Sequence, residues 1–266
     1  MTDHLLRNLA PISDAGWKLI DDEAKGRLTP KLAARRLVDW TGPQGWTYAA
    51  ANLGRIRTVG TDGGEEVAQR VVLPVTEVRV PFTVSRSEIA DAARGAVDLE
   101  LDDLARAASR AAELENAAVL HGWPPAGIVG VGGASSHAPE SLGEDAGQYP
   151  HRVAIAVDRL RLAGIEGPYA LAIGPAGFTR IVETTEHGGH LLLDHLRQIL
   201  GGDVVWAPGV EGAVVLSQRG GDFVLEVGQD LAIGYRSHDA ERVDLNLEES
   251  ITFRVDEPDA AIALTL

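Results

Sequence analysis

The feature that most constrains this chain is a pair of long strand-like segments, Trp46 to Ile56 and Val67 to Val84. The glycine-rich turn between them, Gly60-Thr61-Asp62-Gly63-Gly64, is typical of a hairpin. Pro74 and Pro81 lack the N–H that a ladder requires, which excludes a central place in a sheet. A long two-stranded hairpin is unstable alone in water. It must fold back on its own domain or pair with a neighbouring copy, and the residues leave both interpretations open.

Helical patterns flank this hairpin. Before it, one helix is expected to end near Leu28, and Thr29-Pro30 predicts the start of a second short helix over residues 31–38. After it, Asp98 is expected to cap the longest helix, roughly residues 99–121, which carries an alanine-rich apolar stripe.

Beyond a loop rich in Gly, Ser and Pro, helices alternate with short strands. We expect helices near 150–163, 176–185 and 190–200, and strands at 169–173, 204–206, 213–217, 223–227, 232–235, 242–247, 252–255 and 261–264. Helices and strands are partly segregated along the chain, so the fold class is α+β with a mostly antiparallel sheet.

Composition excludes several classes of protein. The chain has no cysteine, which removes disulfides, Cys-ligated zinc, iron–sulfur clusters and Cys nucleophiles. Its net charge of −15 disfavours nucleic acid and polybasic binding to a membrane surface. It has no apolar run of membrane-helix length and no signal-peptide core, so we expect a cytoplasmic protein.

No motif predicts catalysis. The segment Gly130 to Ser135 lacks the third glycine of a dinucleotide fingerprint, and neither a Gly-x-Ser-x-Gly elbow nor a His-Glu-x-x-His motif is present. The acid pairs Asp21-Asp22, Asp102-Asp103 and Glu248-Glu249 are expected on solvated faces, because acid–base carboxylates need an apolar cleft. We therefore expect no enzyme activity, no metal and no cofactor.

Two further patterns have more than one interpretation. The segment His187-Gly188-Gly189-His190 fits a solvated helix start better than a metal site, and copies of it around a symmetry axis would line a hole. Arg35 and Asp39 are four residues apart and can pair on the predicted short helix. Beside Leu28 and Leu32 this pair would edge an apolar groove, although ordinary helix packing gives the same pattern.

Short segments spread in order along the whole chain resemble encapsulin shell proteins. They are Leu9-Ala10-Pro11, Trp17, Arg36, Val38-Asp39, Gly42-Pro43, Gly45-Trp46, Tyr48-Ala49-Ala50, Ile165-Glu166-Gly167-Pro168-Tyr169, Arg219-Gly220-Gly221-Asp222-Phe223, Gly228-Gln229-Asp230-Leu231, Ile233-Gly234-Tyr235, Thr252-Phe253 and Pro258. Each segment alone is weak evidence for the resemblance, but the full set in this order, in a chain of this length, is specific to that family.

The resemblance implies the fold of tailed-phage major capsid proteins, with a peripheral domain, an extended loop and an axial domain. The corresponding division is N-terminal helices at 1–45, the extended loop at 46–84, the peripheral domain with its spine helix at 85–125, the axial domain at 126–222, and returning strands at 223–266. It also implies a closed icosahedral shell, of about 60 copies in its simplest form, the order of the icosahedral rotation group.

The resemblance further implies a cargo enzyme, a dye-decolourising peroxidase or a ferritin-like protein, tethered inside by a C-terminal peptide. The groove for that peptide would comprise Leu28, Leu32, Arg35, Asp39 and Ile233, and residues 187–190 would line a five-fold pore. Some relatives stack a flavin on a Trp in the short helix after the extended loop. This chain has Ser87 there, so we expect no flavin. A prophage capsid protein that packages DNA is the alternative, and a hydrolase is a more distant one.

Overall fold

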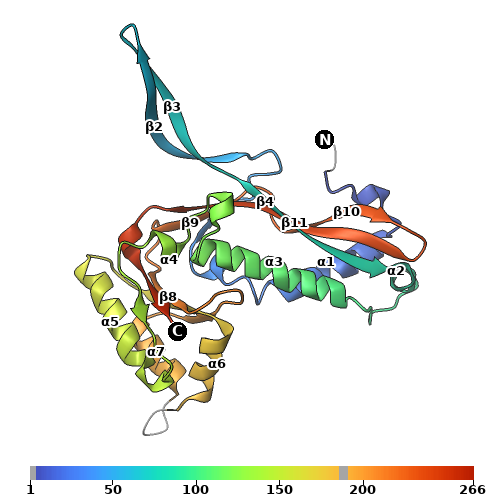
Figure 1. The fold of residues 1–266 in the computed structure, drawn as a ribbon. Coiled ribbons are helices and arrows are strands. Elements are labelled where there is room, and N and C mark those ends of the chain that lie inside the picture. The colour runs from blue at the N-terminus through green and yellow to red at the C-terminus, as the bar shows by residue number, and fades with distance from the viewer. Residues whose placement is uncertain (1–3, 186–190) are drawn as a thin grey trace.

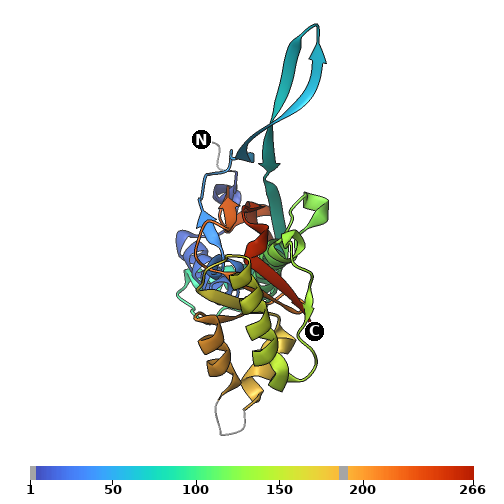
Figure 2. The same ribbon diagram turned by 90° about the vertical axis from the view of Figure 1, so that its left-hand side faces the viewer.

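The computed structural model describes residues 4–185 and 191–266 of the chain. A body built on two sheets carries a long hairpin that projects away from it (Figure 1). The view turned by 90° shows that the hairpin extends well beyond the rest of the described chain (Figure 2).

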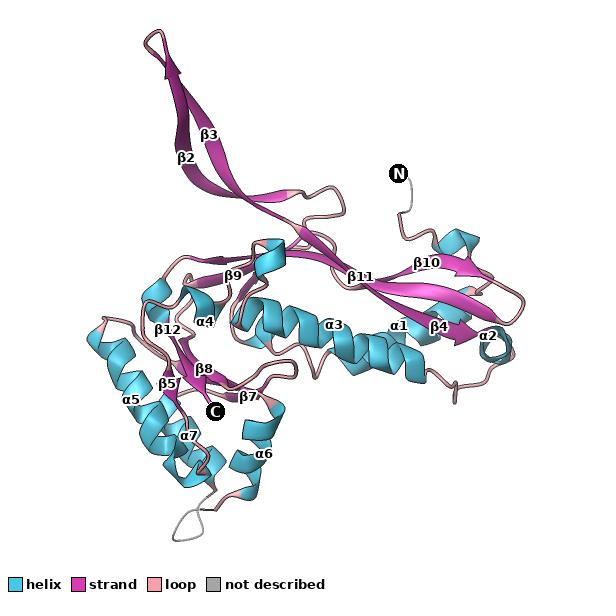
Figure 3. Ribbon diagram, in the orientation of Figure 1, coloured by secondary structure: helices cyan, strands magenta, loops and turns pink. Residues whose placement is uncertain are grey.

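Helices and strands are partly segregated along the chain, with β1 to β4 in one run and β7 to β12 in another, and Figure 3 distinguishes them by colour. The helices are α1 (Asp14–Leu28), α2 (Arg86–Ala93), α3 (Asp102–Leu120), α4 (Val131–Ala134), α5 (Tyr149–Leu162), α6 (Pro175–Glu183) and α7 (Leu192–Leu200), with the short 3-10 helix η2 at Ala34–Arg36. The strands are β1 (Asp39–Thr41), β2 (Ala50–Asp62), β3 (Glu65–Pro74), β4 (Thr76–Ser85), β5 (Glu140–Ser141), β6 (Tyr169–Ile173), β7 (Val204–Trp206), β8 (Ala213–Ser217), β9 (Phe223–Val227), β10 (Ala232–His238), β11 (Arg242–Val255) and β12 (Ala261–Thr265).

The first sheet is organised around the long strand β11. β10 and β9 pair with one side of β11, β4 pairs with its other side, and β1 adds to β9 in parallel. The long helix α3 packs against β4 and α1, and the apolar faces of these elements enclose one core. Pro81 lies in β4, and β11 is the one strand that pairs with β4 among the described residues, which fits a residue with no ladder donor.

The second sheet has the order β5-β12-β8-β6-β7, and α5 and α7 pack together beside it. Every residue of β6 and β8 is buried, as expected for short apolar strands at the centre of a sheet. The neighbouring pairs β6–β8 and β8–β12 are antiparallel, whereas β6–β7 and β12–β5 are parallel. The mixed, mostly antiparallel arrangement confirms the predicted α+β class.

The projecting hairpin, Ala50–Pro74, is called the arm below. Its strands β2 and β3 pair from Ala50 with Pro74 out to Asp62 with Glu65. Apolar side chains along it stay exposed, and Ile56 is 67% exposed. The arm is shorter than the predicted segment 46–84, because β4 pairs with β11 inside the body. The five-part division of the chain stays a prediction.

Two other predictions of local structure were wrong. The helix expected over residues 31–38 is only the 3-10 turn η2, after which the chain extends into β1. The two strands expected at 242–247 and 252–255 are one strand, because the acidic residues between them are buried in it instead of forming a turn.

The fully buried amide of Asn116 on α3 joins three segments. Its Oδ1 accepts the backbone N–H of Ala34 at 2.9 Å, and its Nδ2 donates to the carbonyl oxygens of Lys31 and Pro208 at 2.8 and 3.0 Å. Asn116 therefore holds the η2 segment and the loop before β8 against the long helix.

We expect Asn116→Asp to lower the free energy of unfolding by about 2–5 kcal/mol, because it removes both donors and faces a carboxylate toward two carbonyl oxygens. Thermal and urea unfolding of the purified chain would measure this loss. Tyr149→Phe is the matched control: its buried hydroxyl has no hydrogen-bond partner within the described residues, so its removal should change stability by under about 1 kcal/mol. Wild-type stability in Asn116→Asp would contradict the role of the amide.

Candidate functional site

A groove of about 470 Å³ lies between the end of α1, the segment that follows it and the start of β10. Four of the five residues predicted for the peptide groove line it together: Leu28, Leu32, Arg35 and Ile233. They come from two separate parts of the chain, residues 28–35 and the start of β10, which the packing of α1 on the first sheet brings side by side.

The floor of the groove is apolar. Leu28 and Ile233 are only 6% and 2% exposed and belong to the core of the first sheet. Leu32 is half-buried and packs against the same core. Leu32 is therefore the one of these three side chains with substantial surface left for a ligand.

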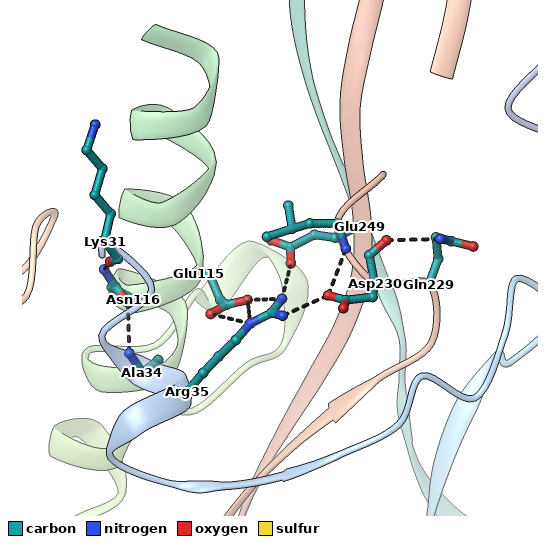
Figure 4. Close-up of polar contacts among 9 residues, drawn as sticks. Lys31, Ala34, Arg35, Glu115, Asn116, Gln229, Asp230 and Glu249 are labelled. Carbon is teal, nitrogen blue, oxygen red and sulfur yellow. Dashed lines mark hydrogen bonds and ion pairs between the residues drawn. The ribbon is translucent and has the colours of Figure 1, made fainter. Parts of the chain in front are cut away.

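Arg35 is held by carboxylates beneath the groove (Figure 4). Its guanidinium lies 2.6 Å from Glu115 of α3, 2.7 Å from Asp230 in the turn before β10, and 3.3 Å from Glu249 of β11. The Arg35 side chain is 17% exposed, and those of Glu115 and Glu249 are 0% and 1% exposed. One cation thus neutralises part of the charge of three acids, two of them buried.

Burial and mutual repulsion shape the proton affinities of this cluster. Burial disfavours the charged form of Arg35, but Glu115 and Asp230 outweigh it and raise the pKa of Arg35. Burial, followed by the charge of Glu115, raises the pKa of Glu249 well above its usual 4.5. Glu249 therefore keeps its proton to a higher pH than an exposed glutamate does, and in the protonated form it can donate a hydrogen bond to Glu115.

The sequence interpretation missed these acids. Glu248-Glu249 was expected on a solvated face, but both side chains are buried, because β11 is covered over most of its length. Glu115 does carry a signal: it lies four residues after Ala111 and seven after Ala108, on the buried stripe of α3. A glutamate on that stripe indicates a buried partner of opposite charge.

Asp39 does not belong to the groove. It begins β1, its Oδ2 accepts the N–H of Gly221 at 2.5 Å, and it lines a separate cavity of about 220 Å³ beside Gln218. The expected pairing of Arg35 with Asp39 is wrong, because the helix that would have placed them on one face does not form.

The remaining predicted positions stand apart from the groove. The pore segment 187–190 lies outside the described residues. Ser87 is exposed on α2, and its Oγ lies 2.6 Å from that of Ser85. No group of three or more His, Asp or Glu side chains that could hold a metal ion occurs in the described ranges. None of the described helices is long and apolar enough to cross a membrane.

The raised pKa of Glu249 predicts a pH-dependent stability. The stability linked to its proton is complete below its usual pKa and is lost as the pH rises through the raised one. Glu249→Gln keeps the shape of the protonated acid, so we expect wild-type stability near pH 5 and higher stability than wild type at pH 8. The difference should grow by up to about 1.4 kcal/mol for each pH unit of the titration.

Urea unfolding of both proteins across this range measures the effect. Glu113→Gln is the control, because Glu113 lies on α3 two residues before Glu115 but its side chain is 37% exposed beside Arg110. If the free energy of unfolding of Glu249→Gln differed from that of wild type by the same amount at every pH, the raised pKa of Glu249 would be contradicted.

Comparison with known proteins accounts for this fold. Residues 1–252 match the Linocin_M18 family model, described as "Encapsulating protein for peroxidase". A "Type 1 encapsulin shell protein" of Rhodospirillum rubrum is 44% identical over 98% of this chain and 95% of its own length. One of Mycobacterium tuberculosis is 39% identical over 99% of both chains.

Solved structures show the same fold at low identity. A virus-like particle from Pyrococcus furiosus aligns with a TM-score of 0.66 at 14% identity, covering 92% of this chain and 98% of its own. The capsid of an empty GTA particle aligns with a TM-score of 0.56 at 14% identity, covering 88% and 89%. These likenesses confirm the expected capsid fold, and the family match spans nearly the whole chain. The chain therefore belongs to the family of encapsulating proteins, among relatives named type 1 encapsulin shell proteins.

Proposed function

We propose that this chain is a structural shell protein that assembles into a closed, hollow icosahedral particle. The observation that carries the proposal is the arm, whose apolar side chains lie in solvent along both strands: Ile56, Val59, Val67 and Val72. A two-stranded hairpin of this kind is not stable without a partner surface, and neighbouring copies in a shell supply one. In the simplest closed shell about 60 copies are equivalent.

The proposed activity is compartmentation without catalysis by the shell itself. The shell would lie in the cytoplasm, which agrees with the absence of cysteine. Residues 187–190 would line pores at the five-fold vertices, where a ring of histidines would tune the passage of ions. No flavin is expected at Ser87.

The groove is proposed to receive a peptide of the cargo enzyme, a peroxidase or a ferritin-like protein. Aliphatic side chains of the peptide would rest on Leu32 above the core residues Leu28 and Ile233. Arg35 is already bound by three carboxylates, so polar contacts would fall to the other charged groups that line the groove. These are Lys25, the ion pair of Arg7 with Asp21, and the exposed part of Asp230. The Asp230 side chain is 40% exposed and available to a ligand.

Electron microscopy and native mass measurement of the purified full chain test assembly. Hollow particles of uniform diameter are expected, and a protein that stays monomeric at micromolar concentration would refute the proposal. The ratio of absorbance at 260 and 280 nm separates an empty or protein-filled shell from a particle that packages DNA.

A further inference from the structure

The N-terminal segment is fastened to the first sheet close to the base of the arm. The carbonyl oxygen of Leu5 accepts the N–H of Tyr235 in β10 at 2.8 Å. The imidazole of His4 stacks on the indole of Trp46, with ring centroids 4.1 Å apart and planes inclined by 12°. Trp46 lies in the segment that leads into β2, so this stack joins the N-terminal segment to the entry of the arm.

Two polar atoms face each other beside this stack without a hydrogen bond. His4 Nε2 lies 3.8 Å from Oε1 of Glu248 in β11. Both atoms are buried, and neither has a hydrogen-bond partner within the described residues. A buried donor or acceptor left unpaired is costly, so this gap needs an explanation.

In the described part of the chain, the other charged groups that act on Glu248 come from β4. Arg79 lies 3.2 Å from Oε2 of Glu248 and 2.9 Å from Glu77, and its guanidinium is 5.8 Å from the ring of Trp46. Burial raises the pKa of Glu248, and the nearby charges of Arg79 and His4 offset this only in part. Among the residues that the structure describes, Glu248 is nonetheless the one acid paired with His4.

We propose that His4 is a proton-operated latch, which ties the N-terminal segment to the base of the arm when its imidazole takes up a proton from solvent. The new Nε2–H then donates to Oε1 of Glu248 and pairs both orphaned atoms. The positive ring also gains attraction to the face of Trp46. Imidazole is the side chain that gains a proton between about pH 8 and pH 5, so the latch closes on mild acidification.

The position of the cluster gives the latch its consequence. Trp46 precedes β2 and Arg79 belongs to β4, so the chain enters and leaves the arm through residues of this cluster. When His4 is protonated, the segment that enters the arm and the strand that leaves it are both held against β11. The hydrogen bond between His4 and Glu248 is lost when the pH rises and the imidazole gives up its proton. The bond also weakens when the pH falls far enough for Glu248 to become neutral.

A fluorescence titration of the full-length protein from pH 8.5 to pH 5 tests the latch. An imidazolium stacked on an indole quenches its emission, so wild type should lose tryptophan fluorescence on acidification. The change should vanish in His4→Gln and in Trp46→Phe. In Glu248→Gln the midpoint should fall by about one pH unit or more, because the charge that stabilises the imidazolium is gone.

His151→Gln is the matched control, since His151 is exposed on α5 in the other part of the body. The fluorescence of His151→Gln should change with pH as that of wild type does. A titration unchanged in His4→Gln, or a wild-type midpoint in Glu248→Gln, would overturn the proposal. His4→Gln changes an N-terminal side chain outside the hydrophobic core, which keeps the test valid if the strand variant folds poorly.

Hydrogen exchange gives a second readout on the same proteins. After correction for the intrinsic rate, the Tyr235 amide should be protected at least threefold more at pH 5.5 than at pH 8 in wild type, and equally at both in His4→Gln. Equal protection in wild type would overturn the latch. Both readouts report on a single chain, so their outcome is independent of whether shells form.

Discussion

Replacement of residues 53–71 by Asn-Gly is expected to abolish closed particles and to leave soluble subunits or small oligomers. The replacement removes most of the arm but keeps the pairs from Ala50 with Pro74 to Asn52 with Val72, and Asn-Gly closes such a pair as a two-residue turn. The body should stay folded, because its two cores contain no residue of the excised part. Size-exclusion chromatography and electron microscopy would report the loss.

A control variant keeps the arm and its apolar surface but changes two polar side chains on it. Thr58→Ser and Arg57→Lys together leave the exposed apolar side chains in place and should assemble normally. Intact shells formed by the armless chain would show that the arm has no part in contacts between copies.

Leu32→Asp is expected to give particles of normal diameter that have lost their cargo. Burying one aliphatic side chain contributes roughly 1.5–3 kcal/mol, and the substitution also places a carboxylate on the groove floor. Many weak peptide contacts act at high local concentration inside a shell and together retain the cargo. Weakening each contact therefore lowers the amount of cargo retained by a larger factor than it lowers the affinity of one peptide. We expect at least a tenfold drop in cargo per particle on co-expression with the native cargo.

The control for Leu32→Asp is Val97→Asp. Val97 is 85% exposed in the connection between α2 and α3 and does not line the groove. It should load like wild type. Full loading of the Leu32→Asp particles would place the docking site elsewhere while leaving the assembly proposal intact.

Arg35→Ala is a poor probe of the same groove. Its removal would leave Glu115 and Glu249 buried without their cation, which typically costs 3–5 kcal/mol. Any loss of cargo in that variant would reflect a damaged fold and not a missing contact with the peptide.

The sequence predicted the parts of the fold that depend on local pattern. Strands β6, β8 and β9 have the predicted bounds, because each is a short apolar run bordered by turn residues. The groove residues Leu28, Leu32 and Ile233 were named through the resemblance, and the structure brings them together.

The parts that failed depend on contacts between distant residues. The continuity of β11 through Glu248 and Glu249 requires Arg35 and Arg79, which lie far away in the sequence. Likewise, residues 31–38 carry a helical pattern. Asn116 accepts a hydrogen bond from the N–H of Ala34 and donates one to the carbonyl oxygen of Lys31, which holds this segment in the 3-10 turn η2. The propensity of a local segment carries no information about partners that lie far away in the sequence.

The route of the chain out of the arm has a mechanical consequence. Only Val75 separates β3 from β4, and β4 is then joined to β11 by a ladder that runs from Ile251 with Thr76 to Arg242 with Ser85. A pull on the arm is therefore passed along β4 in shear, so the ladder bonds share the load instead of opening one by one. β11 continues past that ladder to pair with β9, which carries the load toward the far end of the first sheet. Swelling pressure from a packed interior would thus be borne by backbone ladders before side-chain contacts yield.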